Sequence, residues 1–372
     1  MKTNNRSNTS EVRAEQVTKD GTTTVLPETI YLGVDLHKAS ITITRIIEHS
    51  TPQPGQKFTW DKFWVFMQKQ TTLSKKVYAV YEAGAFGFWA ARKLKAMGIE
   101  CFVVHPEKLD PQHKRVQTDK LDSRHLADNL QRYVLGNKRA MVAVYVPTEA
   151  EEQQRLESRH RESLVKALRA LKRRGAGLLL GQGIFQTHGW WKKPAWEKLA
   201  GRLCPQLEAA LEDDRALIQD LERRVRKAEN KLEASAPREL PKGMGRLSFV
   251  LLQREICNYQ RFHSRRNVGG FTGLCGAVSS SGPYHVDLSI NKAGSPYLRV
   301  QLVELAWRMI YWQPTYTGLK AWKQLQNSGG LSLRRRKIAV VAVARQLAVD
   351  LWKWQTGRMT PKELGWQMTT TE

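Results

Sequence analysis

The chain has 372 residues, with 60 Lys and Arg against 35 Asp and Glu, so its formal net charge is +25. At roughly 150 residues per domain, this length predicts two or three domains that can each bury a core. Hydrophobic residues make up 41% of the chain and charged residues 26%, which excludes a fibrous or wholly disordered protein. The positive excess indicates a polyanionic partner, because Lys and Arg displace the counterions condensed on phosphate backbones.

The sequence carries no sign of a membrane or secreted protein. No apolar run reaches the roughly 18 residues of a membrane-spanning helix, and residues 1–24 lack the apolar core of a signal peptide. The cysteines are widely spaced and form no CxxC pair, which excludes a zinc ribbon and argues against a disulfide framework. They are Cys101, Cys204, Cys257 and Cys275. We therefore expect a cytoplasmic protein.

The positive charge is concentrated in the second part of the chain. Residues 1–150 hold 22 basic and 15 acidic side chains, whereas residues 151–372 hold 38 and 20. Within the second part, residues 238–346 hold 17 basic side chains against 4 acidic ones. This one-sided charge favours nucleic-acid binding, with an anionic membrane surface as the alternative.

The first part of the chain is predicted to be an α/β domain. Residues 1–27 are rich in Asn, Thr and Ser, and we expect a disordered tail there. Over residues 28–149, two strands joined by a short hairpin precede alternating β and α units, which predicts a mixed sheet flanked by helices. The predicted strands span residues 29–35, 39–46, 76–82, 101–104 and 141–146, and the predicted helices span residues 89–97 and 119–134.

The pattern changes near residue 150. Over residues 150–236, two long charged helices carry leucine stripes, which predicts a coiled-coil arm connected through residues 175–194. Since neither helix can bury its stripe alone, we expect the arm to mediate self-association. Residues 237–372 are predicted to form a mainly helical domain, with a Ser/Gly-rich turn at 279–282 and a last helix over 335–354.

Four carboxylates occupy positions that suit chemistry. Asp35 and Glu82 each end a predicted strand, and Asp119 and Asp122 lie at i and i+3 on one helix face. Carboxylate oxygens suit Mg²⁺, and two such ions about 4 Å apart would activate a nucleophile and stabilise the leaving oxygen of a phosphodiester. Taken singly, each has a structural alternative: Asp119 as a helix N-cap, Asp122 as a complement to the helix dipole and Asp35 as a turn former.

The motifs around these carboxylates resemble those of the DEDD insertion-sequence transposases of the IS110 family, with its IS1111 branch. They are Gly33-Val34-Asp35-Leu36-His37-Lys38, Tyr81-Glu82-Ala83-Gly84 and Thr118-Asp119-Lys120-Leu121-Asp122. The resemblance covers most of the chain, from about residue 31 to residue 354. It implies a RuvC-like domain with the ribonuclease H fold over residues 28–149, in which the four carboxylates are catalytic and bind Mg²⁺, with Mn²⁺ as the alternative ion.

A second set of motifs, in the C-terminal part of the chain, resembles those of the second domain of the same family. It comprises Phe271-Thr272-Gly273-Leu274, Ser279-Ser280-Ser281-Gly282, Asn291-Lys292-Ala293-Gly294 and Tyr297-Leu298-Arg299. A Ser-Gly turn alone is weak evidence, because such clusters are usually exposed loops. The resemblance implies that Ser281 carries the covalent chemistry, with Ser279 and Ser280 as alternatives. The family's proline before the serine is absent here, and Ser295 stands in place of its asparagine.

Basic residues near these motifs are candidate nucleic-acid ligands. They are Arg265, Arg266, Lys292, Arg299, Arg334, Arg335, Arg336 and Lys337. Such groups can stabilise the charge that develops during serine attack on phosphate, although plain phosphate contact is their commoner role. Trp190 and Trp191, next to two lysines, suit stacking on unpaired bases, and core packing is an equal alternative.

We therefore interpret the chain as a DNA transposase or recombinase. The resemblance further implies guidance by a structured non-coding RNA, a phosphoserine intermediate, a Holliday-type junction, and dimers or tetramers in which the carboxylates of one protomer meet the serine of another. Two alternatives remain open from the residues: a Holliday-junction resolvase-like metal nuclease that uses water, and a non-catalytic nucleic-acid-binding scaffold.

Overall fold

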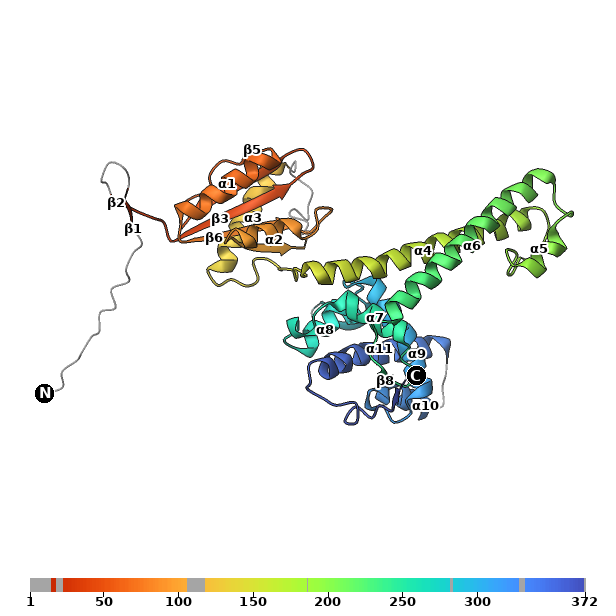
Figure 1. The fold of residues 1–372 in the computed structure, drawn as a ribbon. Helices are drawn as coiled ribbons and strands as arrows, with labels where there is room; N and C mark the ends of the chain where they lie inside the picture. Colours follow the sequence, from red (N-terminus) through yellow and green to blue (C-terminus); the bar gives the residue numbers. More distant parts are fainter. Residues whose placement is uncertain are drawn as a thin grey trace. The chain divides into compact units, whose positions relative to one another are not determined.

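The computed structural model describes residues 15–17, 23–105, 118–185, 187–281, 284–327 and 332–370 (Figure 1). Contacts divide the chain into two compact units, Met1–Pro147 and Thr148–Glu372. The first unit is mixed α/β and the second is mainly helical. The division falls after Pro147, two residues before the end predicted for the α/β domain. It does not separate the predicted helical arm from the C-terminal segment.

A five-stranded mixed sheet forms the centre of the first unit. Its order is β5–β4–β3–β6–β7, with β3 (Thr29–Leu36), β4 (Ile41–Ile47), β5 (Gln56–Phe58), β6 (Lys76–Glu82) and β7 (Glu100–Val104). Strand β3 pairs antiparallel with β4 and parallel with β6, and β6 is parallel to β7. The predicted mixed sheet is confirmed.

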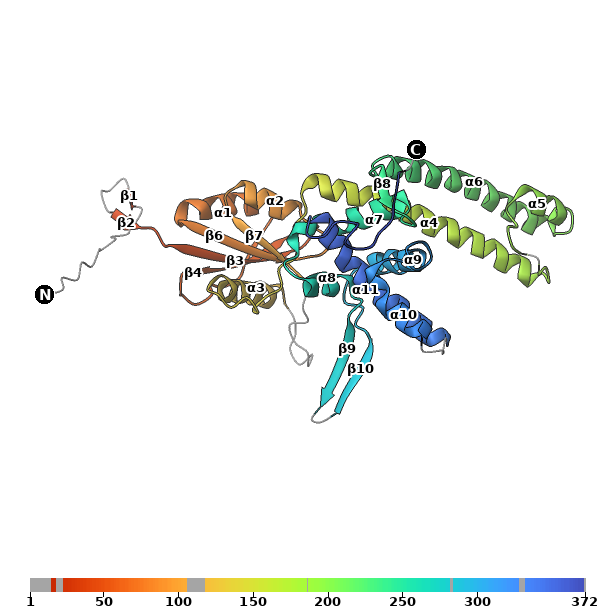
Figure 2. The ribbon, with the colours of Figure 1, turned by 90° about the horizontal axis from the view of Figure 1, so that it is seen from below.

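The alternation along β3 creates two different faces of the sheet. Ile30, Leu32 and Val34 are buried in the core beneath α1 (Trp60–Leu73) and α2 (Trp89–Ala96). Tyr31 belongs to the opposite face, which packs against α3 (Asp119–Val134). Figure 2 shows α1 and α2 on one side of the sheet and α3 on the other.

Helix α3 approaches the sheet unusually closely at Gly33. A Cβ atom on Gly33 would lie 2.0 Å from the carbonyl oxygen of Ser123 and 2.4 Å from the backbone nitrogen of Ala127. Beside it, the hydroxyls of Thr44 and Ser123 share a hydrogen bond of 3.0 Å, and both side chains are buried. Only glycine at position 33 allows the helix backbone to rest directly on the strand.

Parts of the first unit differ from the sequence prediction. The predicted strand over residues 141–146 is wrong: Ala143 forms an isolated antiparallel bridge to Val104, because this segment meets β7 only near its last residue. Helix α1 and strand β5 were not predicted. Residues 15–17 and 23–25 pair as antiparallel strands, so the prediction of a disordered tail does not hold for them.

Two long helices of the second unit lie side by side (Figure 1). They are α4 (Glu149–Gly181) and α6 (Pro205–Glu233), and the short helix α5 (Lys193–Leu199) lies in their connection. Ion pairs join the two long helices, including Lys172 Nζ to Glu222 Oε1 at 2.6 Å and Arg174 Nη1 to Asp214 Oδ1 at 2.8 Å. The predicted pairing of two charged helices is therefore confirmed within one chain.

Trp190 belongs to the core of this helical pair. Its ring is fully buried, its Nε1 donates to the carbonyl oxygen of Lys172 at 3.0 Å, and it occupies the space that a Cβ on Gly175 would need. Base stacking by Trp190 is therefore wrong, and core packing, the other alternative, is correct. Trp191 is half-buried, and its Nε1 donates to Glu222 Oε1 at 3.2 Å.

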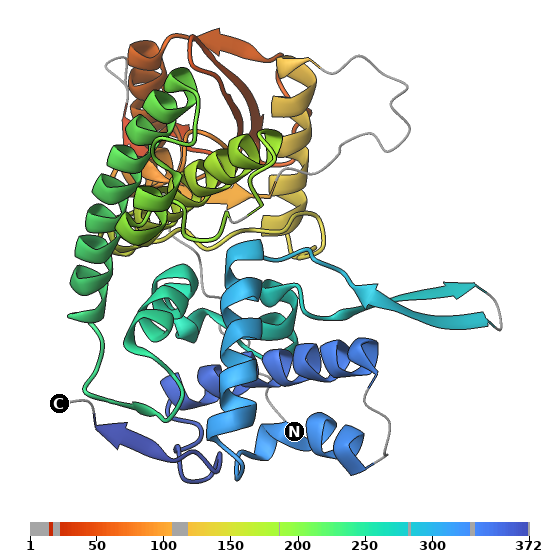
Figure 3. The same cartoon turned by 90° about the vertical axis from the view of Figure 1, so that its right-hand side faces the viewer.

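The rest of the second unit surrounds a large apolar core. Its elements are β8 (Glu239–Pro241), α7 (Arg246–Ile256), α8 (Arg265–Thr272), β9 (Gly276–Ser281), β10 (Tyr284–Ile290), α9 (Pro296–Trp312), α10 (Lys320–Asn327), α11 (Leu333–Gln355) and β11 (Met368–Thr370). Strands β9 and β10 form an antiparallel hairpin that projects from the helices (Figure 3). The predicted turn at 279–282 is therefore wrong for Ser279, Ser280 and Ser281, which belong to a strand. Gly282 lies outside the described residues.

Replacing Trp190 by Ala should lower the free energy of unfolding by about 3–5 kcal/mol, because it leaves a large cavity between α4 and its connection. Urea unfolding followed by circular dichroism measures the change. Trp191→Ala is the matched control and should cost less, since Trp191 is only half-buried. An unchanged unfolding midpoint for Trp190→Ala, with weaker nucleic-acid binding, would restore the stacking interpretation.

Candidate active site

Asp35 and Glu82 lie near the carboxyl ends of neighbouring parallel strands, β3 and β6. Tyr31 is in register with Tyr78, and Gly33 with Val80, and each carboxylate follows the second of these pairs by two residues. Residues in register on parallel strands project to the same face, and the stacked rings of Tyr31 and Tyr78, 5.8 Å apart, show this directly. Both carboxylates therefore belong to the face that packs against α3.

Helix α3 contributes Asp119 and Asp122 from its first turn. Its N-cap is Thr118, whose hydroxyl accepts a hydrogen bond from the backbone N–H of Leu121 at 3.4 Å. The N-cap alternative for Asp119 is therefore wrong. Because the N-cap is already provided by a threonine, both carboxylates of the turn are available to other partners near the sheet.

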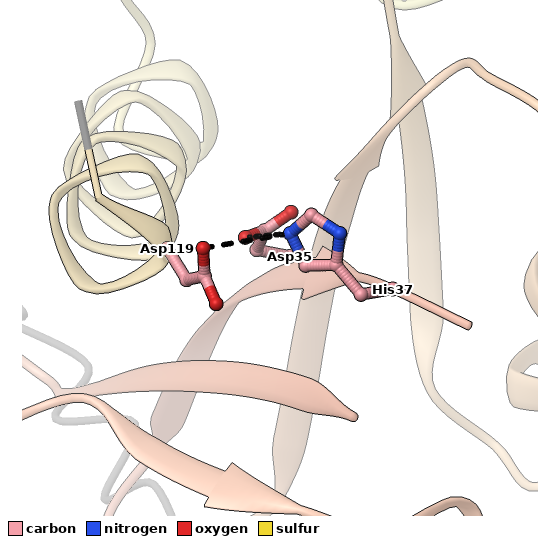
Figure 4. A group of neighbouring side chains, drawn as sticks. All are labelled: Asp35, His37 and Asp119. Carbon is pink, nitrogen blue, oxygen red and sulfur yellow. Dashed lines mark hydrogen bonds and ion pairs between the residues drawn. The ribbon is translucent and has the colours of Figure 1, made fainter. Parts of the chain in front are cut away.

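His37 joins Asp35 and Asp119 (Figure 4). Its Nε2 lies 3.1 Å from Asp35 Oδ2 and 3.6 Å from Asp119 Oδ1, and candidate ligand atoms of the three residues all lie within 4.8 Å of one another. Lys57 Nζ lies 3.7 Å from the other oxygen of Asp119. His37 was not among the predicted site residues, although it lies in the motif around Asp35. Its position two residues after Asp35 was the signal that could have revealed it.

Two of the carboxylates, Asp35 and Asp122, have a raised pKa. Burial raises the pKa of Asp35, and the charges of Asp119 and Asp122 raise it further, while His37 opposes the shift. Burial also raises the pKa of Asp122, with Asp119 acting in the same direction and His125 and His37 against it. Mutual repulsion of this kind is relieved by a bound cation.

These residues fit a hard divalent cation. Carboxylate oxygens from a strand end and from a helix turn are the ligand type that Mg²⁺ and Mn²⁺ prefer. The structure brings Asp35 and Asp119 together directly and places Asp122 close enough to interact with Asp35 electrostatically. Glu82 ends the neighbouring strand β6. The catalytic roles of the four carboxylates remain predictions.

The register of the serine hairpin bears on which serine could react. Ser281 is the Cα partner of Tyr284, Ser280 of His285, and Ser279 of Val286. His285 is therefore level with Ser280 and not with Ser281. The assignment of the reacting serine remains a prediction.

Several predicted basic residues converge on one cleft of the second unit, with a volume of about 1330 Å³. Arg265 and Arg266 reach it from the first turn of α8, and Arg334 and Lys337 reach it from the start of α11. Arg335, Arg336, Lys292 and Arg299 are not among its lining residues. Arg299 instead braces a loop, because its Nη1 donates to the carbonyl oxygens of Lys292 at 3.1 Å and Gly294 at 2.6 Å.

Comparison with known proteins decides the family. A model of the transposase IS116/IS110/IS902 family matches residues 240–320, which include the serine hairpin. The chain is 31% identical over 307 residues to a putative transposase, y4rJ, of Sinorhizobium fredii, covering 74% of this chain and 76% of that protein. The chain belongs to the IS110 family of insertion-sequence transposases.

Other members of the family align over a similar length. The transposase for insertion sequence element IS1111A of Coxiella burnetii is 26% identical over 309 residues, 78% of this chain and 81% of that protein. The transposase for IS1533 of Leptospira borgpetersenii is 23% identical over 298 residues, 75% of this chain and 85% of that protein. The family resemblance inferred from the motifs is confirmed. No helix among the described residues of this transposase is long and apolar enough to cross a bilayer.

Replacing Gly33 by Ala should separate α3 from β3 and so disturb the carboxylate group. A methyl group there would overlap the backbone of Ser123 and Ala127, and overpacking of this kind costs about 1–3 kcal/mol. We expect a lower melting temperature and weaker Mn²⁺ binding by isothermal titration calorimetry.

Gly84→Ala is the matched control for stability, because a Cβ at Gly84 has no atom within 4 Å. A Gly33→Ala protein that melts and binds Mn²⁺ like the Gly84→Ala protein would show that the close helix contact does not position the carboxylates.

Proposed function

We propose that this transposase cleaves and exchanges DNA strands at a site built from Asp35, Glu82, Asp119 and Asp122, with Ser281 as the nucleophile. The observation that carries the proposal is the meeting of Asp35 and Asp119, whose ligand atoms lie within 4.8 Å, in a chain that belongs to a transposase family. The mixed sheet, with α3 packed on its carboxylate-bearing face, supports a RuvC-like ribonuclease H fold for the first unit.

The four carboxylates would hold Mg²⁺ or Mn²⁺. Such an ion, when bound, supplies electrostatic stabilisation for the leaving oxygen of a phosphodiester. His37 and Lys57 have a different role, since each lies next to Asp119 and limits the repulsion among the carboxylates while no phosphate is bound. Asp35 also accepts a hydrogen bond from His37, which fixes its carboxylate at the strand end.

In the proposed covalent step, the Ser281 hydroxyl oxygen attacks the phosphorus of the strand. The bond from Oγ to phosphorus forms as the bond to the leaving strand oxygen breaks; the serine proton passes to solvent and the leaving oxygen gains a proton. A hydroxyl of another strand then attacks the same phosphorus and releases the serine. Because each bond broken is replaced by an equivalent bond, strand exchange needs no outside energy source.

We also propose RNA guidance and assembly into dimers or tetramers. The excess of 38 basic over 20 acidic side chains in residues 151–372 supports binding of more nucleic acid than one DNA site. Sequencing of RNA that co-purifies with the protein tests the guide, and its absence from active protein would contradict it.

The helical arm gives weaker support for self-association than the sequence suggested. Helices α4 and α6 bury Leu179, Leu211 and Ile218 against each other and the connecting segment. Part of each apolar stripe is therefore buried within one chain. Exposed leucines remain at Leu156, Leu180 and Leu217 and offer an apolar surface to a second copy. Sedimentation that finds only monomers, with and without nucleic acid, would refute assembly through this arm.

Replacing Asp35 by Asn should lower Mg²⁺-dependent strand cleavage by roughly 10²-fold or more, since a ligand charge is lost from the site that stabilises the developing negative charge. Asp119→Asn should act in the same way. Cleavage of a labelled DNA substrate with increasing Mg²⁺ measures the effect, and Asp61→Asn, an exposed carboxylate of α1, is the matched control. Equal activity of Asp35→Asn and Asp61→Asn would remove Asp35 from the site.

Ser281 should become covalently joined to a DNA end during the reaction. Trapping on a nicked substrate, denaturation and peptide mapping identify the attached residue. An adduct on Ser279 or Ser280 would correct the register and keep the mechanism. Efficient recombination by Ser281→Ala without any serine adduct would refute the mechanism and favour a nuclease that uses water.

A further inference from the structure

The cleft of the second unit combines strong positive charge with little to neutralise it. Six exposed cations line it: Arg265, Arg266, Lys320, Arg334, Lys337 and Arg345. None of the six is paired with a carboxylate within the part of the chain that the structure describes. Like charges gathered on one concave surface repel one another, and this repulsion is relieved when an anion binds between them.

Asp350, the carboxylate among the described lining residues of the cleft, already has hydrogen-bond and ion-pair partners. Asp350 is buried, accepts hydrogen bonds from Tyr316 Oη at 2.8 Å and Gln346 Nε2 at 2.9 Å, and lies 3.4 Å from Lys353 Nζ. Its charge is therefore balanced by Lys353 and by two neutral donors. The six exposed cations remain available for a ligand.

Apolar side chains stand beside these cations. Ile338 and Leu288 line the cleft and are 61% and 51% exposed, and Val341 and Met359 lie further in, half-buried. A surface that binds phosphate alone needs no exposed isoleucine and leucine. The combination suits a ligand with both anionic groups and flat apolar parts, which describes a nucleotide.

The size of the cleft indicates a polymer. Its volume of about 1330 Å³ exceeds the roughly 300–1,000 Å³ of small-molecule pockets. In a duplex the flat faces of the bases are stacked on one another, so the apolar side chains could contact them only in an unpaired strand. Both features together favour a few linked, unpaired nucleotides.

We propose that this cleft binds a short unpaired segment of a nucleic-acid strand, with its phosphates on the cations of α8 and α11 and its bases against Ile338 and Leu288. The inference rests on the part of the proposed function by which the transposase binds nucleic acid. It does not require Ser281 to be the nucleophile. Unpaired DNA and unpaired RNA share the chemistry, and the experiment below distinguishes them.

The cleft also has a defined relation to the serine hairpin. Gly276, at the start of β9, lines the cleft, and Ser281 ends the same strand (Figures 2 and 3). Five residues of extended strand span about 17 Å, so the cleft lies within that reach of Ser281 along β9.

The experiment measures binding without cleavage. Fluorescence anisotropy of labelled oligo(dT), oligo(U) and duplex DNA is recorded with the Ser281→Ala protein in EDTA at several salt concentrations. Loss of strand cleavage, which would refute the proposed function, cannot alter this result. Tighter binding of one single strand names DNA or RNA as the ligand, and either outcome supports the proposal.

Two kinds of variant separate charge from apolar contact. Arg265→Glu with Arg266→Glu should weaken single-strand binding at least about tenfold and lower the salt slope by about 1.4, as expected for two lost phosphate contacts. Ile338→Ser, at an exposed position, should weaken single-strand binding about threefold or more while leaving duplex binding and the salt slope unchanged.

The matched control is Lys62→Glu with Lys69→Glu, which makes the same charge change on exposed residues of α1. Equal loss in this control and in the α8 variant would show only general electrostatic attraction and overturn the proposal. An Ile338→Ser protein that binds single strands like the parent, or loses duplex binding equally, would also overturn it.

Discussion

The candidate active site depends on one steric constraint, the absence of a side chain at Gly33. The carbonyl oxygen of Ser123 and the backbone nitrogen of Ala127 occupy the space where a Cβ would lie, so α3 rests directly on β3. The buried hydrogen bond between Ser123 and Thr44 fixes the helix along the strand direction as well. Because Asp119 and Asp122 precede Ser123 in the first turn of the same helix, this contact determines where both carboxylates meet Asp35.

The electrostatics of the site follow from this packing. Asp35 and Asp122 both have raised pKa values, from burial first and from neighbouring carboxylates second, which means that the fold holds like charges closer than they would settle in water. His37 and Lys57 reduce this repulsion at the exposed edge, where their side chains are 53% and 63% accessible. The proposed divalent ion would place one strong positive charge among the carboxylates, where His37 and Lys57 act only from the exposed edge.

The sequence predicted local elements well and long-range arrangements poorly. The strand ending at Glu82 and the helix over Asp119–Val134 were exact, because alternation and helical periodicity are encoded in neighbouring residues. The predicted strand around Ala143 failed, since strand formation there depends on how much of β7 it meets. The strand over Ser279–Ser281 was missed because Ser and Gly are typical of turns. These residues form a strand here because they pair with β10, and their residue types do not indicate that pairing. The burial of Trp190 could not be read from its neighbours either, because the lysines beside it say nothing about Gly175, which is distant in sequence and leaves room for its ring.

The proposed strand exchange needs both carboxylates and cations, and the chain carries them in different units. The carboxylate group belongs to the first unit and the basic cleft to the second. Carboxylates repel a phosphate unless a cation lies between them, so the carboxylate group of the first unit would need a metal ion before a phosphate could approach it. Lys and Arg side chains attract the phosphate backbone of a nucleic acid, but such contacts alone do not stabilise the negative charge on one leaving oxygen. The second unit alone would therefore bind a strand without activating it for exchange. The proposed role of the cleft adds something that net charge does not provide, because Ile338 and Leu288 would contact unpaired bases while the cations bind phosphates. A chain with a net charge of +25 would attract any nucleic acid, and these apolar positions would direct that general attraction toward strands that have been opened.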